Sequence, residues 1–297
     1  RRRREVLDGG PLHRVLMLLA PEVNEWRWRV SNVDGARPAG NYGASVTPGN
    51  NTKGSWAQVL AAASVTEQSL MMMVNINSVS VSAAAKDCLV DIGVGPSGSE
   101  QLLIQDLIGS CASGWNTTAG GWTYFFPLSL PAGTRIAARA SVNNATVGSV
   151  RVIVRLFGRP SRRETVNAGA WIDTYGANTA ASNGTTATPG TASNGSWVQL
   201  GTLTRAAWWW QFGMGVNDTT MTNLVTTADI AVGDATTKRI LLNQMPVMTS
   251  ASEQAGNLPS SVQGPGVARA GENIYGRLWC QGTPDSNYSL TAYALGG

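Results

Sequence analysis

Residues 47–58 read TPGNNTKGSWAQ, and residues 188–199 read TPGTASNGSWVQ. Both stretches place Thr-Pro-Gly four residues before Gly-Ser-Trp, and both end on a glutamine two residues after the tryptophan. A match of this kind between two parts of one chain indicates a duplicated structural unit. The duplication therefore decides the fold prediction for the whole sequence.

Further repeats follow at a constant separation of 138 residues. The matched pairs are Asp91–Gly95 with Asp229–Gly233, Leu102–Gln105 with Ile240–Asn243, and Ala132–Arg139 with Ala270–Arg277. A constant register over three separated segments is hard to obtain by chance. We therefore expect one unit at residues 42–160 and a second, of nearly equal length, at residues 175–297.

The remaining segments lie outside the repeat. Residues 161–174 are polar and contain a glycine, which is typical of a linker. Residues 1–41 form an added N-terminal arm, in which Trp26–Val30 alternates with period two and predicts a half-buried or edge strand.

Short apolar runs separated by turn residues recur within the first unit. They are Leu70–Ile76, Leu89–Val94, Gln101–Ile108, Thr123–Leu128, Arg135–Ser141 and Ser149–Phe157. Helix signals are scarce, and Gly, Pro or Asn turns come about every ten residues, as in sandwiches and jelly rolls. The sequence predicts an all-β fold of two tandem antiparallel β-sandwich, jelly-roll-like domains with an extended N-terminal arm.

The composition points to assembly. Charged residues make up 13% of the chain, about half of the roughly 25% usual for soluble domains. A sparsely charged surface suits burial against partner subunits, because a monomer normally relies on charge for its solubility. A homo-oligomer is the first expectation.

The positive charge is concentrated at the N-terminus. Residues 1–40 hold eight arginines against five acidic residues, and four of these arginines are Arg1, Arg2, Arg3 and Arg4. Such a run is a candidate docking arm for nucleic acid or an acidic protein surface, while a solvated terminus is the alternative. No stretch is apolar over the roughly 20 residues that a bilayer requires, so no membrane partner is expected.

Catalytic and metal chemistry are not expected. His13 is the single histidine and lies in the arm, which excludes histidine-based triads and multi-histidine metal sites within either unit. Asp91 and Asp229 are the acids kept at equivalent positions, whereas Asp106 is matched by Gln244. A lone aspartate beside a buried strand favours a hydrogen-bond anchor over an acid–base role. No cofactor is predicted, and Cys88, Cys111 and Cys280 have no metal-type spacing, which favours buried free thiols.

Tryptophans form the most informative residue class. Trp208, Trp209 and Trp210 occupy the register of Leu70–Met72, so they lie in a strand whose side chains alternate between faces. At least one should face away from the core, for subunit packing or, as the alternative, for sugar stacking. Trp56 and Trp197 each follow a Gly-Ser turn and are predicted to fill the cores.

The first unit resembles β-sandwich modules of tailed-bacteriophage virion proteins. The matching segments are Gly54–Trp56, Asp91–Leu107, Tyr124–Ala140 and Val150–Gly158. The second unit is diverged, since Leu130–Gly133 corresponds to Ala268–Gly271 and the Tyr-Phe-Phe-Pro strand has no recognisable counterpart. The resemblance implies a structural role in a virion as head decoration, head fibre or tail appendage, and it supplies no catalytic residues.

The expected function is therefore that of a non-enzymatic virion protein that decorates or bridges capsid or tail subunits and stabilises the particle. The first alternative is a carbohydrate-binding adhesion module that recognises host surface glycans. The second is a coat protein of a small virus, with a basic arm that contacts the genome.

Overall fold

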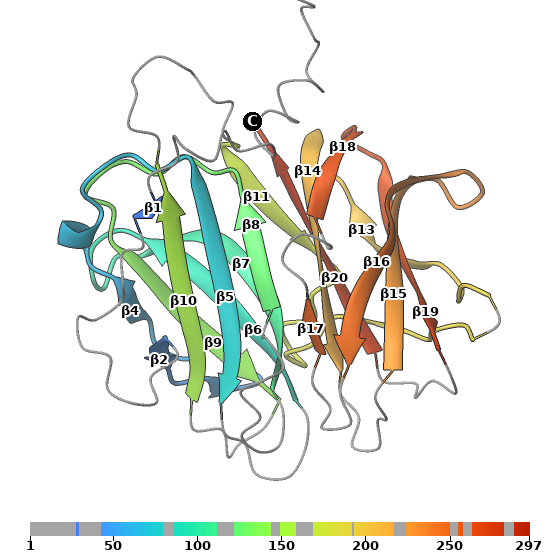
Figure 1. Cartoon of the computed structure of the whole chain (residues 1–297), viewed down its shortest axis with the longest axis horizontal. Coiled ribbons are helices and arrows are strands. Elements are labelled where there is room, and N and C mark those ends of the chain that lie inside the picture. Colours follow the sequence, from blue (N-terminus) through green and yellow to red (C-terminus); the bar gives the residue numbers. More distant parts are fainter. Residues whose placement is uncertain are drawn as a thin grey trace, which may run out of the picture.

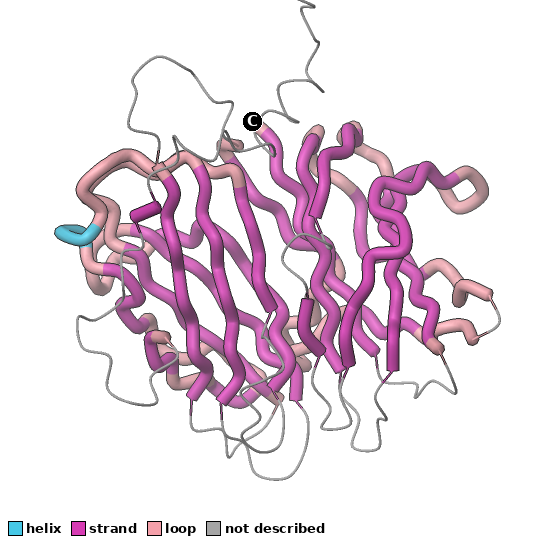
Figure 2. The backbone as a smooth tube through the Cα atoms, viewed as in Figure 1, coloured by secondary structure: helices cyan, strands magenta, loops and turns pink. Residues whose placement is uncertain are grey.

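The computed structural model describes residues 28–29, 43–79, 86–111, 122–143, 149–158, 169–191, 193–216, 224–249, 255–257, 263–281 and 288–297. These residues are almost entirely strands and turns (Figure 2), with one short 3-10 helix, η1, at Ala62–Ser64. No helix in these ranges is long and apolar enough to span a membrane.

The first unit is a pair of packed sheets (Figure 1). Its strands are β2 (Ala44–Val46), β3 (Gly49–Asn50), β4 (Ala57–Leu60), β5 (Met71–Val79), β6 (Lys86–Val94), β7 (Gln101–Cys111), β8 (Trp122–Phe126), β9 (Ile136–Val142) and β10 (Ser149–Phe157). One sheet has the order β1-β10-β5-β8, with β1 (Trp28–Arg29) from the arm and with β2 also on β10. The other has the order β3-β9-β6-β7, with β4 also on β9.

The second unit repeats this plan. Its strands are β11 (Trp171–Tyr175), β12 (Thr185–Ala187), β13 (Val198–Thr202), β14 (Ala207–Val216), β15 (Leu224–Gly233), β16 (Lys238–Thr249), β17 (Ala255–Asn257), β18 (Gln263–Ala268), β19 (Asn273–Cys280) and β20 (Tyr288–Gly296). The sheets run β11-β20-β14-β18, with β12 also on β20, and β13-β19-β15-β16-β17.

The antiparallel pairs are nested in both units. In the first, β2 pairs with β10, β4 with β9, β5 with β8, and β6 with β7. In the second, β11 pairs with β20, β13 with β19, β14 with β18, and β15 with β16. A long hairpin folded over on itself in this way is a jelly roll. The all-β, two-sandwich prediction is confirmed.

Two strands lie at the boundaries that the sequence predicted between the arm, the linker and the units. Strand β11 begins at Trp171, inside the stretch 161–174 that the sequence assigned to a linker, and it pairs with β20 along its whole length. In the arm, Trp28 and Arg29 pair with Phe157 and Leu156, so the predicted edge strand exists as β1.

The two units meet along a seam, which we define as the face of β14 and β20 laid against β7 and β8. All nine residues of β20 are buried, whereas its counterpart β10 alternates between buried and half-buried positions. The difference arises because β20 packs on its own unit through one face and on the first unit through the other. The sequence matches this placement, because β10 carries Arg151 and Arg155 while β20 has no charged residue.

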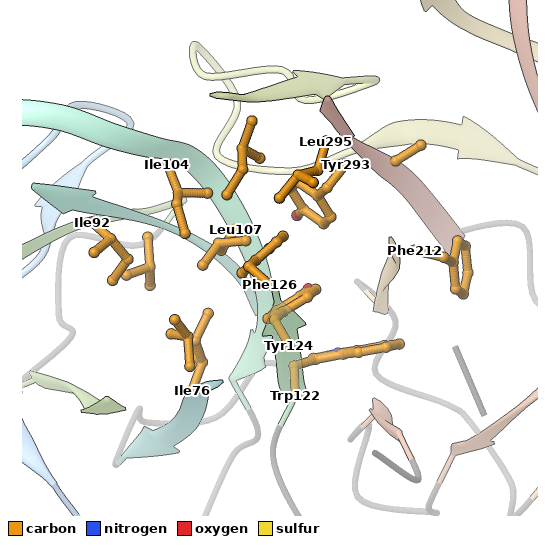
Figure 3. Packing of buried hydrophobic residues seen from close by; sticks show 14 of the residues in the cluster. Ile76, Ile92, Ile104, Leu107, Trp122, Tyr124, Phe126, Phe212, Tyr293 and Leu295 are labelled. Atoms are coloured by element: carbon orange, nitrogen blue, oxygen red, sulfur yellow. The ribbon is translucent and has the colours of Figure 1, made fainter. Parts of the chain in front are cut away.

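The hydrophobic core is continuous across the seam. Figure 3 shows Trp122, Tyr124 and Phe126 of β8 beside Phe212 and Tyr293 of the second unit. The rings of Tyr124 and Tyr293 meet edge to face with centroids 5.2 Å apart, and Trp122 meets Phe212 in the same manner at 6.2 Å. The seam is therefore packed like a domain interior rather than like a contact between two independent domains.

Glycine allows this close approach at one critical point. A Cβ atom at Gly213 would overlap Ile108, Thr291 and the hydroxyl of Tyr124. We predict that Gly213→Val lowers the free energy of unfolding by about 1–3 kcal/mol, because the seam must open to admit the side chain. Guanidinium unfolding monitored by tryptophan fluorescence measures this change.

Asn75→Val is the matched control, because Asn75 occupies the register of Gly213 in the first unit and is partly exposed. The change removes the hydrogen bond of 2.8 Å from Asn75 Nδ2 to Thr123 Oγ1, so its expected loss is about 1 kcal/mol. Equal losses for the two variants would contradict the role assigned to the seam.

Candidate functional site

The centre of the seam is a buried tyrosine network. The Tyr293 hydroxyl accepts a hydrogen bond from the Ile108 backbone N–H (2.7 Å) and donates one to the Asp106 carbonyl (3.0 Å). Thr291 donates to the same hydroxyl at 2.9 Å, and the Tyr124 hydroxyl donates to the Ile108 carbonyl at 2.5 Å. These contacts hold the backbone of β7 against the second unit and leave the Tyr293 hydroxyl fully hydrogen-bonded.

Burial sets the protonation of this network. Loss of hydration on burial is the largest influence on both phenols and raises the pKa of Tyr124 well above its ordinary value. It raises the pKa of Tyr293 as well, against the opposing effect of the hydrogen bonds from Thr291 and Ile108. Both tyrosines therefore remain neutral hydrogen-bond donors at any physiological pH.

Further hydrogen bonds extend the seam on both sides of the tyrosines. They join Ser289 Oγ to Asp87 Oδ2 (2.7 Å), Thr179 Oγ1 to Asp106 Oδ2 (3.0 Å), Trp209 Nε1 to the Phe125 carbonyl (3.2 Å) and the Gly169 N–H to the Pro127 carbonyl (2.7 Å). Residues far apart in the sequence, by 202 positions in the case of Ser289 and Asp87, are thus fixed in one register. The seam combines apolar burial with directional contacts.

A second feature is a charged cluster on the outer side of the first unit, centred on Asp91. Lys53 Nζ contacts Asp91 Oδ1 at 2.8 Å, Asp106 Oδ1 at 2.7 Å and the Leu89 carbonyl at 3.0 Å. Arg139 Nε donates to Asp91 Oδ2 at 2.8 Å. Lys53 therefore donates a hydrogen bond to a backbone carbonyl and forms ion pairs with both carboxylates, and such pairing is the condition for burying these charges.

The backbone explains why an aspartate is needed there. Strand β7 bulges opposite Asp91, and Asp106 in the bulge has a φ of 54°, in the left-handed region. The Asp106 N–H is not used by the strand ladder and donates to Asp91 Oδ1 at 2.9 Å. Asp91 therefore anchors the bulge, and the predicted hydrogen-bond anchor is confirmed.

The second unit repeats the bulge with fewer charges. Gln244 has a φ of 48° and donates its N–H to Asp229 Oδ1 at 2.6 Å, and Arg277 Nε donates to Asp229 Oδ2 at 2.7 Å. Asn194 takes the place of Lys53 and lies 3.4 Å from Asp229 Oδ2. Since Lys53 and Asp106 are replaced together, the formal charges balance in both clusters.

An arginine–tryptophan contact completes each cluster. The Arg139 guanidinium lies 4.5 Å from the ring centre of Trp56, and that of Arg277 lies 4.2 Å from the ring centre of Trp197. Both tryptophans are half-buried on the outer side of a sheet. The prediction that they fill the cores is wrong. Each ring instead lies on the outer face of a sheet, where an arginine guanidinium covers it.

The carboxylates of the first cluster are engaged in structural contacts. The side chains of Asp91 and Asp106 are 1% and 3% exposed, and their oxygens are bound to cations, to an N–H group or to Thr179. No group of three potential metal ligands occurs within the described ranges. The clusters stabilise strand geometry.

The structure separates the three tryptophans of the 208–210 run. Trp209 is 4% exposed and Trp210 is fully buried, with indole N–H groups donated to the carbonyls of Phe125 and Gly266. Trp208 is half-buried and packs against the core and the edge of Trp209. All three lie in β14, as expected, but the pairing of β14 with β18 is irregular between Ala207 and Trp209, and Trp208 is the member that retains exposed surface.

The remaining candidates fall partly outside the described residues. Arg1, Arg2, Arg3 and Arg4 lie there, as does His13. Cys88 and Cys280 are buried free thiols, as expected from their spacing.

Sequence reasoning missed two groups. Lys53 and Asn194 lie within the repeated stretches 47–58 and 188–199, but their contact with the aspartates depends on strand pairing across the sheet. Tyr293 lies in β20, which has no charged residue, whereas its counterpart β10 carries Arg151 and Arg155. This difference was the sequence signal that β20 is buried on both faces.

Comparisons with known proteins give weak similarities only. No protein-family model matches the chain, and no curated protein sequence matches it. The chain is similar in structure to PNGF-II, with 10% identity, a TM-score of 0.37, and coverage of 96% of this chain and 67% of that chain. It is similar to PNGase F, a glycosylasparaginase from Flavobacterium meningosepticum, with 10% identity, a TM-score of 0.32, and coverage of 89% and 92%.

A third similarity is to a chain of Broad Bean Stain Virus, with 8% identity, a TM-score of 0.29, and coverage of 89% of this chain and 94% of that chain. At TM-scores below 0.5, none of these likenesses carries an argument about function.

The charge balance of the first cluster depends on Lys53. Lys53→Asn leaves two buried carboxylates with one cation and should lower the free energy of unfolding by about 3–5 kcal/mol. The double variant Lys53→Asn, Asp106→Gln copies the second unit and should lose only about 1–2 kcal/mol. Chemical denaturation of both variants tests this, and a double variant no more stable than the single one would contradict the account.

The buried tyrosines generate a pH prediction. Below about pH 10 both the folded and unfolded chains carry neutral phenols. At higher pH the unfolded chain ionises while Tyr293 stays protonated in the folded state, so the free energy of unfolding falls.

Tyr293→Phe should reduce the steepness of this fall by up to about 1.4 kcal/mol per pH unit. Denaturation curves between about pH 9 and about pH 11 measure the slope. A slope that does not change in the variant would show that Tyr293 ionises normally.

Proposed function

We propose that the protein is a non-enzymatic structural component of a bacteriophage virion, where it decorates or bridges capsid or tail subunits and stabilises the particle. The resemblance of residues 54–158 to phage virion modules suggests the setting. The observation that carries the proposal is the seam, which joins two jelly rolls into one body with a continuous core. Such a body suits mechanical bracing between subunits.

The chemistry of the described residues supports a structural role. The carboxylates of Asp91, Asp106 and Asp229 are committed to the strand bulges, and the buried tyrosine hydroxyls are committed to the seam. A protein that binds only assembled subunits stabilises that assembly by mass action, and it needs no reactive group for this purpose. Arg1–Arg4 remain the proposed docking arm, with an acidic face of a capsid or tail subunit as partner.

The two alternatives make different use of the chain. A glycan-binding module would rely on Trp208, since the rings of Trp209 and Trp210 are buried and cannot stack on a sugar. A coat protein of a small virus would use the basic arm to contact the genome.

The direct test mixes the purified full chain with particles that lack it, separates free from bound protein, and images the complex. We expect ordered, stoichiometric occupancy of a capsid or tail lattice, and a higher temperature of particle opening. A variant with Arg1–Arg4 changed to glutamine should occupy the lattice less and lose the salt dependence of binding.

Trp208→Ala serves as the matched control and should bind particles like the unchanged chain. Failure of the full chain to bind particles, together with Trp208-dependent binding to host polysaccharide, would overturn the proposal in favour of the adhesion module. Salt-dependent binding to nucleic acid without occupancy of particles would favour the coat protein instead.

A further inference from the structure

The amino group of Lys53 is enclosed with two carboxyl groups in the first unit. Its Nζ lies 2.8 Å from Asp91 Oδ1 and 2.7 Å from Asp106 Oδ1, and the side chains of the lysine and the two aspartates are 10%, 1% and 3% exposed. Bulk water therefore has little access to the cluster. An amine held against a carboxyl group away from water is a pair of reactants from which an amide bond forms.

The contact between Lys53 and Asp106 differs from a hydrogen-bonded ion pair. Lys53 Nζ donates a hydrogen bond to the Leu89 carbonyl at 3.0 Å, whereas Asp106 Oδ1 accepts no hydrogen bond from any described residue. The nitrogen thus approaches this carboxyl group outside the direction of a hydrogen bond. Because a C–O bond is about 1.2 Å long, Nζ lies at most about 3.9 Å from Asp106 Cγ. This limit is close to the separation of about 3–3.5 Å from which aligned groups react.

We propose that Lys53 and Asp106 form an intramolecular amide bond after the chain has folded. The new bond joins Lys53 Nζ to Asp106 Cγ, the bond from Cγ to one carboxyl oxygen breaks, and one water molecule leaves. An ammonium and a carboxylate become a neutral amide and water, so atoms and charge balance without an oxidant or a cofactor. Fixing the two groups in contact supplies most of the entropy that the same reaction costs between free molecules. This modification is independent of the proposed virion role.

Asp91 is placed to carry the protons. Its Oδ1 lies 2.8 Å from Lys53 Nζ, and Arg139 Nε binds its Oδ2 at 2.8 Å. A carboxylate that keeps a cation of its own is a poor target for a nucleophile, so Asp106 and not Asp91 is attacked. Asp91 takes the two protons that Nζ loses, one at a time, passes them to the departing oxygen and ends in its original state.

Thr179 completes the site from the second unit. Its Oγ1 donates a hydrogen bond to Asp106 Oδ2 at 3.0 Å. This donor stabilises the negative charge that develops on Oδ2 as Nζ attacks, and Oδ2 becomes the carbonyl oxygen of the amide. Because Thr179 reaches Asp106 only across the seam, the bond should form only after the two units have packed together.

The second unit provides an internal comparison. In its cluster Asn194 and Gln244 stand in the places of the lysine and the attacked aspartate, so no amine is available. The remaining charges are those of Asp229 and Arg277, whose side chains meet at 2.7 Å. Amide formation leaves the first cluster with the same single aspartate–arginine pair, and it removes one buried ion pair with its cost of desolvation.

Mass spectrometry of the intact, purified full chain is the first test. We expect a mass lower than that of the sequence by one water molecule, and a tryptic digest with one branched peptide that joins the segments around Lys53 and Asp106. A mass equal to that of the sequence would overturn the proposal. A lost water that maps to a single unbranched peptide would also overturn it, because a cyclised aspartate loses water without joining two segments.

Lys53→Arg removes the primary amine but keeps the positive charge, so this variant should retain the full mass. Lys238→Arg is the matched control, because Lys238 lies over the Tyr275 ring at 4.5 Å and contacts neither aspartate of the first cluster. The control should lose one water like the unchanged chain. Loss of water that persists in Lys53→Arg would contradict the assignment of the nucleophile.

The contribution of the second unit has its own readout. Thr179→Ala should slow formation of the branched product by roughly tenfold or more, and Thr179→Ser should restore the rate. The linked fraction against time after cell-free synthesis measures this, and circular dichroism verifies that each variant is folded. Equal rates in all three chains would overturn the role of Thr179.

The stability losses given above for the two variants at Lys53 count the ion pairs alone. Neither variant can form the amide bond, so its absence adds equally to both losses. The predicted difference between Lys53→Asn and the double variant is therefore unchanged.

Discussion

The burial of both faces of β20 is the constraint on which the rest of the structure depends. One face completes the sandwich of the second unit, and the other closes the open side of the first between β7 and β8. A strand in that position can carry no charge, and its neighbour β14 needs glycines where backbones and side chains approach closely. The tyrosine pair, the continuous core and the fixed relation of the two units all follow from this double burial.

The two copies of the unit give two solutions to one local problem. Each has a bulged strand with a non-glycine residue in the left-handed region, and each holds it with a buried aspartate and an arginine. In the first unit the bulge lies in the seam, where Thr179 binds the second oxygen of Asp106 and Lys53 balances the added charge. In the second unit the corresponding position is exposed, and the pair Asn194 and Gln244 serves without the extra charges.

Much of the fold could be predicted from the repeat alone. The runs at residues 101–108, 135–141 and 149–157 fall within or very near the strands β7, β9 and β10, because short alternating segments between turns specify strands directly. The seam could not be predicted, because a pattern of buried positions does not say which surface buries them. For the same reason Trp56 was assigned to a core, whereas the structure places it under Arg139 on an outer face.

The central claim is that the two jelly rolls behave as one cooperative body, since their core and their hydrogen bonds continue across the seam. Differential scanning calorimetry of the full chain tests this most directly. The account predicts one transition whose calorimetric enthalpy equals its van't Hoff enthalpy. Two resolved transitions, with each unit melting independently of the other, would contradict it.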